Sequence, residues 1–231
     1  MVRPDELTPV AEDYLKVVWG ALEWSDEPVT TKLLAERLGV GAPTVSETVR
    51  RLSDQGLLEH ARYGAIGLTE LGRRHAVRMV RRHRLLETFL VSQLGYSWDE
   101  VHDEAEVLEH AVSERLVDRL DVALGHPARD PHGDPIPTPD GRVERLDAVL
   151  LAHVPAGGAG VVARISDADP QVLRRLAALG VDLDGELEVL EQVEASGTTR
   201  VRLGRGETLV LGLAETSSVW LVPRAAAPGD R

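Results

Sequence analysis

The sequence predicts a mainly helical chain with some β structure: a helical unit with a hairpin, a helical middle part and a small antiparallel barrel. Apolar residues recur at helical spacing before residue 125, whereas short strand-like runs follow residue 160. Between them, residues 126–141 contain five prolines among sixteen residues, which excludes regular structure there. We therefore expect three domains, at residues 1–73, 74–141 and 142–231.

The first domain is predicted to be a winged helix-turn-helix. Thr8-Pro9 places a capping hydroxyl before a proline, which is typical of a helix start, and Gly39 is typical of a helix end. Three helices with a short turn between the last two, followed by a hairpin, are typical of that fold. The expected elements are a helix from Pro9, a helix from Thr30 or Thr31 to Leu38, a helix from Pro43 to about Gln55, and strands at 56–60 and 65–69.

The third helix of such a unit lies in the major groove of DNA, where its outward side chains reach base edges. Val45, Val49 and Leu52 are expected to face the core. The net charge of −12 argues against nucleic acid, but residues 1–84 hold 13 basic and 12 acidic side chains, so the acidity lies later in the chain. A plain scaffold or a protein-binding module is the alternative. The candidate DNA contacts are Pro43, Thr44, Ser46, Glu47, Arg50, Arg51 and, in the hairpin, Arg62.

The middle part holds side chains that could bind a divalent metal. We expect one helix from about Thr69 to Gln93 and another from about Trp98 to Leu124. A solvated acidic helix face is the alternative to a metal site. On the first helix His83 and Glu87 share a face, and on the second the oxygen and imidazole donors sharing a face are His102, Glu106, Glu109 and His110.

After the proline-rich segment, five short strands and one helix predict a small antiparallel barrel. The strands are expected at 161–165, 186–190, 199–203, 208–211 and 219–222, and the helix at about 170–178.

The composition excludes several classes of protein. The chain has no cysteine, which excludes disulfides and thiolate metal sites. No apolar run approaches the roughly 20 residues that span a bilayer, and the N-terminus lacks a basic, apolar signal region. We therefore expect a cytoplasmic protein with no membrane partner.

Five motifs together resemble one family. They are EDYL at 12–15, GAPTVSETV at 41–49, RHRLLE at 82–87, HDEAEVLEH at 102–110 and PHGDPIP at 131–137. The chain is thereby identified as similar to the diphtheria toxin repressor family of metal-dependent bacterial repressors. The resemblance implies a homodimer that binds a double-stranded DNA operator, a helical domain for metal binding and dimerisation, and a C-terminal barrel of the Src-homology-3 type. It also implies a repressor of genes for metal homeostasis, and no enzyme.

The resemblance implies two metal sites. The principal site falls on Asp13, Glu106, Glu109 and His110. The ancillary site falls on His83, Glu87 and His102, with a possible barrel ligand between Asp167 and Gln171, for which Asp169 is the first choice.

The resemblance also bears on the metal. Iron-type members carry Met and Cys at the positions of Asp13 and Glu106, whereas manganese-type members carry Asp and Glu. Carboxylates are hard ligands that suit manganese(II). We therefore expect a manganese(II) sensor, with an iron(II)-dependent repressor of iron-uptake genes as the alternative. One manganese-type pattern has Glu at position 16 for a second adjacent ion, and here that residue is Lys16.

An ion shared by Asp13 and the later ligands would relieve the repulsion among their carboxylates and tie the first helix to the helical middle part. Metal would then favour the arrangement of a dimer that matches successive major grooves. Two other classes are weighed against this hypothesis. One is a metal-dependent hydrolase, for which no nucleophile is present, and the other is a metalloprotein adaptor that binds no DNA.

Overall fold

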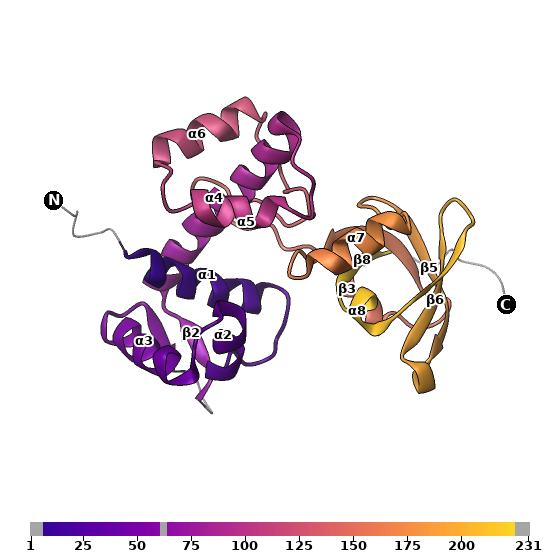
Figure 1. Ribbon diagram of the computed structural model, residues 1–231, viewed down its shortest axis with the longest axis horizontal. Coiled ribbons are helices and arrows are strands. Elements are labelled where there is room, and N and C mark those ends of the chain that lie inside the picture. The colour runs from indigo at the N-terminus through magenta and orange to yellow at the C-terminus, as the bar shows by residue number, and fades with distance from the viewer. Residues whose placement is uncertain (1–6, 61–63, 225–231) are drawn as a thin grey trace. The chain divides into compact units, whose positions relative to one another are not determined.

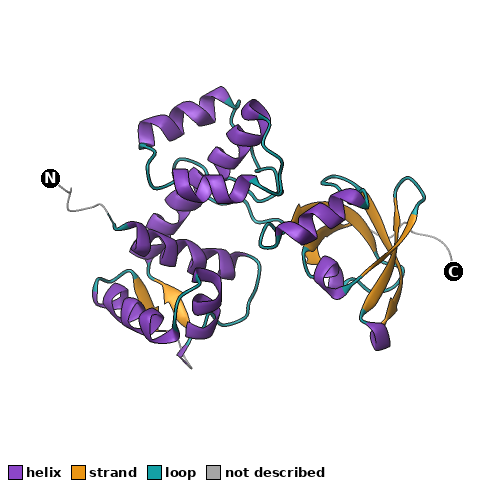
Figure 2. Ribbon diagram, in the orientation of Figure 1, coloured by secondary structure: helices purple, strands orange, loops and turns teal. Residues whose placement is uncertain are grey.

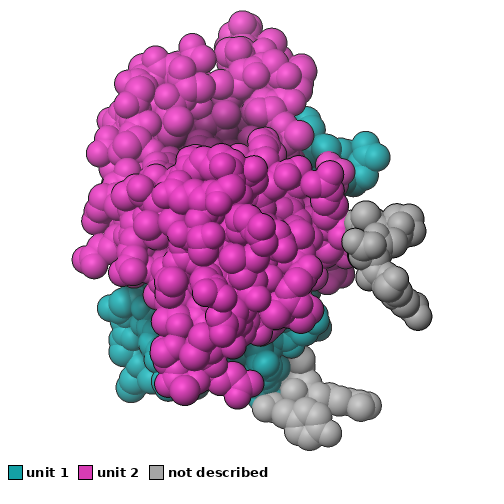
Figure 3. Space-filling model, turned by 90° about the vertical axis from the view of Figure 1, so that its right-hand side faces the viewer, with its two compact units in different colours: residues 1–83, 109–112, 137–142 teal, residues 84–108, 113–136, 143–231 magenta. Residues whose placement is uncertain are grey.

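The computed structural model describes residues 7–60 and 64–224, which form two compact units (Figure 1, Figure 3). One unit holds residues 1–83, 109–112 and 137–142, and the other holds 84–108, 113–136 and 143–231. The long helix α4 (Glu70–Leu94) crosses from the first unit into the second after His83.

The first unit has the predicted winged helix-turn-helix, with every element within about two residues of its expected position. Thr8 and Thr30 cap two of its helices, since their hydroxyls accept hydrogen bonds from Ala11 N (3.3 Å) and Leu33 N (3.2 Å). Gly39 ends the second helix in the left-handed conformation, at φ +66°. The elements are α1 (Pro9–Glu23), α2 (Thr31–Leu38), α3 (Ala42–Asp54), β1 (Leu58–His60) and β2 (Ile66–Leu68), with the two strands antiparallel.

The hairpin is fixed to the start of α4. A Cβ atom at Gly72 would lie 1.9 Å from the carbonyl oxygen of Leu57, so only glycine allows this approach. The hydroxyl of Thr69 donates to the carbonyl oxygen of Gly56 (2.6 Å). The wing is therefore attached to the helix that leads into the rest of the chain.

The prediction of one helix from Trp98 to Leu124 is wrong, because the chain forms two helices there. They are α5 (Val101–Leu108) and α6 (Glu114–Ala123), and residues 109–111 form a turn. Ser113 begins the second of them, since its hydroxyl accepts a hydrogen bond from Leu116 N (3.3 Å). Glu109 and His110 therefore leave the helix that holds His102 and Glu106, and the four do not share one helical face.

The proline-rich segment is irregular, as expected, but it is packed as a core element. Its one β-pairing among the described residues is an isolated antiparallel bridge between Arg129 and Pro135. The side chains of Asp130, His132 and Asp134 are all buried. Gly133 has a φ of +92°, and a Cβ atom there would lie 2.1 Å from the carbonyl oxygen of Ala163 on the next sheet.

Two buried arginines hold this segment in place within the second unit. Arg84 of α4 donates to the carbonyl oxygen of Pro135 (2.6 Å) and to Asp134 (3.2 Å). Arg164 donates to the same Asp134 carboxylate (2.7 Å) and lies 4.3 Å from the ring centroid of Trp220. The segment thereby connects α4 to the C-terminal domain.

The C-terminal domain contains an antiparallel sheet of six strands in the order β3-β8-β4-β5-β6-β7. Its strands are orange in Figure 2. Its core contains strand residues such as Val189 and Val201 together with Leu173 and Leu176 of a helix, and Trp98 packs against it. Five strands lie where the sequence predicts them, and the two-residue strand β3 is additional. The elements are β3 (Val149–Leu150), η2 (Leu151–His153), β4 (Ala159–Ile165), α7 (Pro170–Ala178), β5 (Glu186–Val193), η3 (Glu194–Ser196), β6 (Thr198–Leu203), β7 (Thr208–Leu211), α8 (Leu213–Thr216) and β8 (Val219–Pro223).

Among residues 7–60 and 64–224, every helix is too short or too polar to cross a membrane.

Candidate metal centres and DNA-binding helix

The first unit brings together a group of metal-binding side chains, which we call the first cluster: Asp13, Glu109 and His110. One donor atom from each lies within 4.8 Å of the others. Asp13 belongs to α1, whereas Glu109 and His110 belong to the turn after α5. Two carboxylates and an imidazole are suitable ligands for a divalent cation. The residues are therefore compatible with the metal that the sequence predicts.

Glu109 is fully buried and is held from two sides. His83 Nδ1 donates to Glu109 Oε2 (2.6 Å), and Lys16 Nζ donates to Glu109 Oε1 (2.5 Å). Burial raises the pKa of Glu109, but the hydrogen bond from His83 and the charges of His83 and Lys16 outweigh it, so the pKa is lowered. Glu109 is thus held as a carboxylate.

His110 contacts carboxylates with both ring nitrogens. Nε2 lies 2.8 Å from Asp13 Oδ1, and Nδ1 lies 2.9 Å from Glu12 Oε2. Burial lowers the pKa of His110, whereas the hydrogen bond to Glu12 and the neighbouring carboxylates raise it, and the net change is upward. Metal-ligating histidines commonly donate their second N–H to a carboxylate, which fixes the ring. Glu12 has this geometry, and its place beside Asp13 is the sign of it in the sequence.

Two predicted ligands, His83 and Glu106, each contact a residue of their own unit. His83, which the resemblance assigns to the ancillary site, contacts Glu109 of the first cluster. Glu106 belongs to the second unit, where its carboxylate lies 3.5 Å from His102 Nε2. Its role as a ligand with Asp13 stays a prediction.

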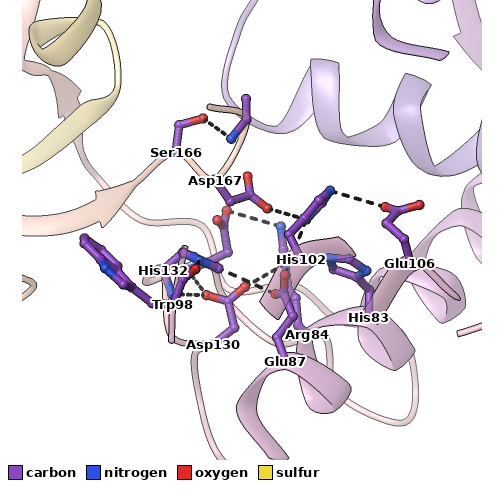
Figure 4. A network of polar contacts seen from close by, with 12 residues as sticks. His83, Arg84, Glu87, Trp98, His102, Glu106, Asp130, His132, Ser166 and Asp167 are labelled. Carbon is purple, nitrogen blue, oxygen red and sulfur yellow. Dashed lines mark hydrogen bonds and ion pairs between the residues drawn. The ribbon is translucent and has the colours of Figure 1, made fainter. Parts of the chain in front are cut away.

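The second unit contains another group, which we call the second cluster: Glu87, His102, Asp130, His132 and Asp167 (Figure 4). Glu87, His102 and Asp167 offer donor atoms within 4.8 Å of one another, and so do Glu87, Asp130 and His132. His102 Nδ1 lies 3.0 Å from Asp167 and 3.4 Å from Glu87, whose side chain is 1% exposed. The cluster joins α4, α5, the proline-rich segment and the loop after β4.

Charges in the second cluster change the pKa of several members. Burial lowers the pKa of His102, but hydrogen bonds to Asp167 and Glu87 raise it to about 11. His132 behaves in the same way beside Glu87, with a pKa of about 10. Burial and the charges of Asp134 and Glu87 raise the pKa of Asp130 to about 8. Without a metal, protons on the histidines therefore balance these carboxylates.

His132 is further oriented by its surroundings. Its Nε2 lies 2.6 Å from the carbonyl oxygen of Trp98, and the two rings stack at 6.1 Å between centroids. Asp130 and His132 were missed from the sequence because the proline-rich segment was interpreted as a linker. The signal was present in the close succession of two acids and a histidine between its prolines.

The barrel residue beside His102 is Asp167, and Asp169 has another role. Asp169 is exposed and caps α7, with its carboxylate accepting a hydrogen bond from Gln171 N (2.8 Å). The choice of Asp169 as the barrel ligand is therefore corrected to Asp167.

The predicted DNA-binding helix α3 presents the expected face. Val45, Val49 and Leu52 are buried. Arg62 lies outside the described residues. The exposed residues of the predicted set are Pro43, Thr44, Ser46, Glu47, Arg50 and Arg51.

Three family models match the chain. They are "Iron dependent repressor, N-terminal DNA binding domain" over residues 6–66, "Iron dependent repressor, metal binding and dimerisation domain" over 69–138, and "FeoA domain" over 149–223. The chain thus has a DNA-binding domain and a dimerisation domain, whose partners are a DNA operator and a second copy of the chain.

Whole-length relatives agree with these models. The iron-dependent repressor IdeR of Mycobacterium tuberculosis is 35% identical over 209 residues, which cover 85% of this chain and 90% of that protein. The diphtheria toxin repressor of Corynebacterium glutamicum is 30% identical over 198 residues, covering 81% and 86%. A solved manganese-dependent transcriptional repressor in complex with manganese is 56% identical, with a TM-score of 0.89 and coverage of 93% and 100%. These relatives are DNA-binding regulators and not enzymes, and the chain belongs to the iron-dependent repressor family, which includes the diphtheria toxin repressor.

Proposed function

We propose that this chain is a manganese(II)-activated repressor of genes for metal-ion uptake, which binds its operator as a homodimer in the cytoplasm. The observation that carries the proposal is the first cluster, in which Asp13 of α1 meets Glu109 and His110 of a turn far along the chain. The solved manganese-dependent repressor, at 56% identity, supports the same metal.

The first cluster can couple metal to DNA because its ligands come from separate segments of one unit. Asp13 lies on α1, which packs against α2, and α2 packs against α3 in the winged helix-turn-helix. A bound cation supplies positive charge that offsets the carboxylates. Held together in this way, Asp13 and His110 would fix α1 to the turn and so restrict the DNA-binding unit to one arrangement.

Glu106 is proposed as a fourth ligand, in accordance with the family pattern. His83 is proposed to assist the first cluster through Glu109, because it donates to that carboxylate. The exposed residues of α3 from Pro43 to Arg51, together with Arg62, are proposed to contact DNA.

The donor set favours manganese(II). Every proposed ligand is a carboxylate or an imidazole, which are hard or intermediate donors. The second candidate is an iron(II)-dependent repressor, which the mycobacterial relative, named an iron-dependent repressor, favours. The two candidates differ in which metal activates DNA binding at the concentration present in the cell.

The second cluster is proposed as a second cation site. Glu87, Asp130 and Asp167 supply carboxylates, and His102 and His132 supply imidazoles, all from one unit. Because its members come from α4, α5, the proline-rich segment and the barrel, an ion there would stabilise the attachment of the barrel.

We retain the division at residues 73 and 141 as the proposed domain boundaries.

The test is an anaerobic titration of DNA binding with manganese(II), iron(II) and zinc(II). A duplex is first selected from a random pool with the metal-loaded protein, and binding is then followed by fluorescence anisotropy at fixed salt. We expect manganese(II) to activate binding at its physiological concentration. Activation by iron(II) alone would support the second candidate, and metal-independent binding would contradict both.

A further inference from the structure

We propose that the ammonium group of Lys16 is an internal competitor of the divalent cation at Glu109, and that it sets the metal concentration at which the first cluster fills. The inference rests on the proposed function and adds a regulating residue to it. Its basis is the contact between Lys16 Nζ and Glu109 Oε1 at 2.5 Å, inside the unit that holds the first cluster.

The two oxygens of Glu109 have different neighbours. Oε2 accepts the hydrogen bond from His83 Nδ1 (2.6 Å). Oε1 faces His110, whose Nε2 lies 3.8 Å away and itself contacts Asp13. An ion that Asp13, Glu109 and His110 share would use Oε1, because Oε2 is already engaged by His83. Lys16 therefore occupies the oxygen that the metal needs.

The charges explain why Lys16 is there. A fully buried carboxylate is costly unless a positive charge pairs with it. Lys16 provides this charge at Glu109 in the metal-free chain, with His83 on the other oxygen. A divalent cation beside Glu109 would repel the ammonium group at close range. Loading is thus an exchange of one cation for another.

The ammonium group of Lys16 is able to move away from Glu109 Oε1. Its side chain is 13% exposed while that of Glu109 is 0% exposed, so the Lys16 side chain reaches solvent and the Glu109 side chain does not. A lysine reaches through a flexible four-carbon stem and is strongly hydrated in water. The exchange needs no movement of α1, only a change of side-chain rotamer.

Removing the competitor should strengthen metal binding. A hydrogen bond to a charged group contributes enough that its loss changes an equilibrium by about 10- to 100-fold. We therefore expect Lys16→Met to bind manganese(II) about 10- to 100-fold more tightly than the parent protein. Lys16→Gln, which can still donate a hydrogen bond but has no charge, should show a smaller gain.

Two control variants separate charge from shape and position. Lys16→Arg keeps the charge and should stay within about threefold of the parent. Lys32→Met removes a lysine whose side chain is 85% exposed and 3.7 Å from Glu36, and it should leave the affinity unchanged.

The experiment is calorimetric titration of the full-length, metal-free protein with manganese(II) chloride, with free manganese checked by electron paramagnetic resonance. Melting temperatures without metal give a second readout: Lys16→Met should melt lower than the parent, and saturating manganese(II) should close most of that gap. Lys16→Gln serves the same comparison if Lys16→Met does not fold.

Equal or weaker manganese binding by both neutral variants would overturn the inference, since it would make Lys16 neutral or helpful to the site. Tighter binding by Lys16→Arg, to the same degree as Lys16→Met, would also overturn it. If the parent protein takes up no manganese(II), the proposed function itself fails, and the inference with it. The parent titration thus separates the two failures.

Discussion

The first cluster joins helix α1 to the turn after α5, whereas the second joins α4, α5, a proline-rich segment and the barrel. Both consist of carboxylates and imidazoles, but they differ in what balances the negative charge. In the first, the ammonium group of Lys16 pairs with Glu109. In the second, protonated histidines beside Glu87 and Asp167 serve that purpose.

This difference indicates how each cluster would respond to its surroundings. In the first cluster the ammonium group of Lys16 lies on the oxygen that a metal ion would use, so the filling of this cluster depends on the concentration of metal. Histidines exchange protons, so metal must displace protons from the second cluster, and its affinity depends on pH. The first cluster is suited to sensing and the second to fastening the barrel.

The largest effect is expected from removing a ligand of the first cluster. Asp13→Ala should weaken metal-activated DNA binding by about 100-fold or more, because the connection from α1 is lost. Anisotropy titration of the selected duplex measures this loss. Asp26→Ala, an exposed acid in the turn between α1 and α2, is the matched control. Retained activation in Asp13→Ala would remove this residue from the site.

The second largest effect concerns the number of ions bound. Asp167→Asn should reduce manganese binding from two ions to one per subunit, because His102 loses a carboxylate partner at 3.0 Å. Elemental analysis after equilibrium dialysis counts the ions. Asp169→Asn is the control, since asparagine also caps helices and the count should stay at two. If both variants keep two ions, Asp167 does not belong to the second cation site.

A smaller effect is expected from the residue that orients His110. Glu12→Gln should weaken manganese(II) binding about tenfold, since the carboxylate that accepts from Nδ1 is replaced by a neutral amide. Calorimetry measures the manganese(II) affinity, and Glu36→Gln, at an exposed position, is the control. An unchanged affinity would show that His110 needs no such partner.

The most gradual effect is on the pH dependence of the second cluster. His102 and His132 have pKa values of about 11 and 10 in the folded chain, above the ordinary value of 6.5. Their contribution to metal-free stability is therefore full below pH 6.5 and is lost as pH rises towards 10 and 11. Over the same window manganese(II) should bind the second cluster more tightly. Chemical denaturation at several pH values, with and without metal, checks both trends, and stability that rises with pH in the metal-free protein would contradict them.

The sequence predicts the winged helix-turn-helix and five of the six barrel strands because these elements carry local signals. Thr8, Thr30 and Gly39 mark helix ends through contacts with their near neighbours, and alternation marks the strands. The missing strand β3 has only two residues, which is too short for a pattern. Local signals suffice where local interactions decide the structure.

The parts that were missed depend on distant contacts. The sequence predicts one continuous helix from about Trp98 to Leu124 because the hydrophobic spacing continues past Leu108, yet the chain turns at Glu109, which pairs with Lys16. The cap at Ser113 was a usable signal that the periodicity obscured. Asp130 and His132 gained their neighbours only from tertiary packing, and no spacing rule brings them to Glu87.

The packing of Gly133 and Asp134 has a consequence for the way the chain can be altered. The segment around them is buried and is held by Arg84 and Arg164, so its length is as fixed as that of a strand in a sheet. Cutting the gene at codon 141 to remove the barrel would leave the Arg84 and Asp134 pair without Arg164. The barrel of this chain therefore cannot be exchanged as an independent cassette; a functional chimera would have to take the proline-rich segment and its arginine partners with it.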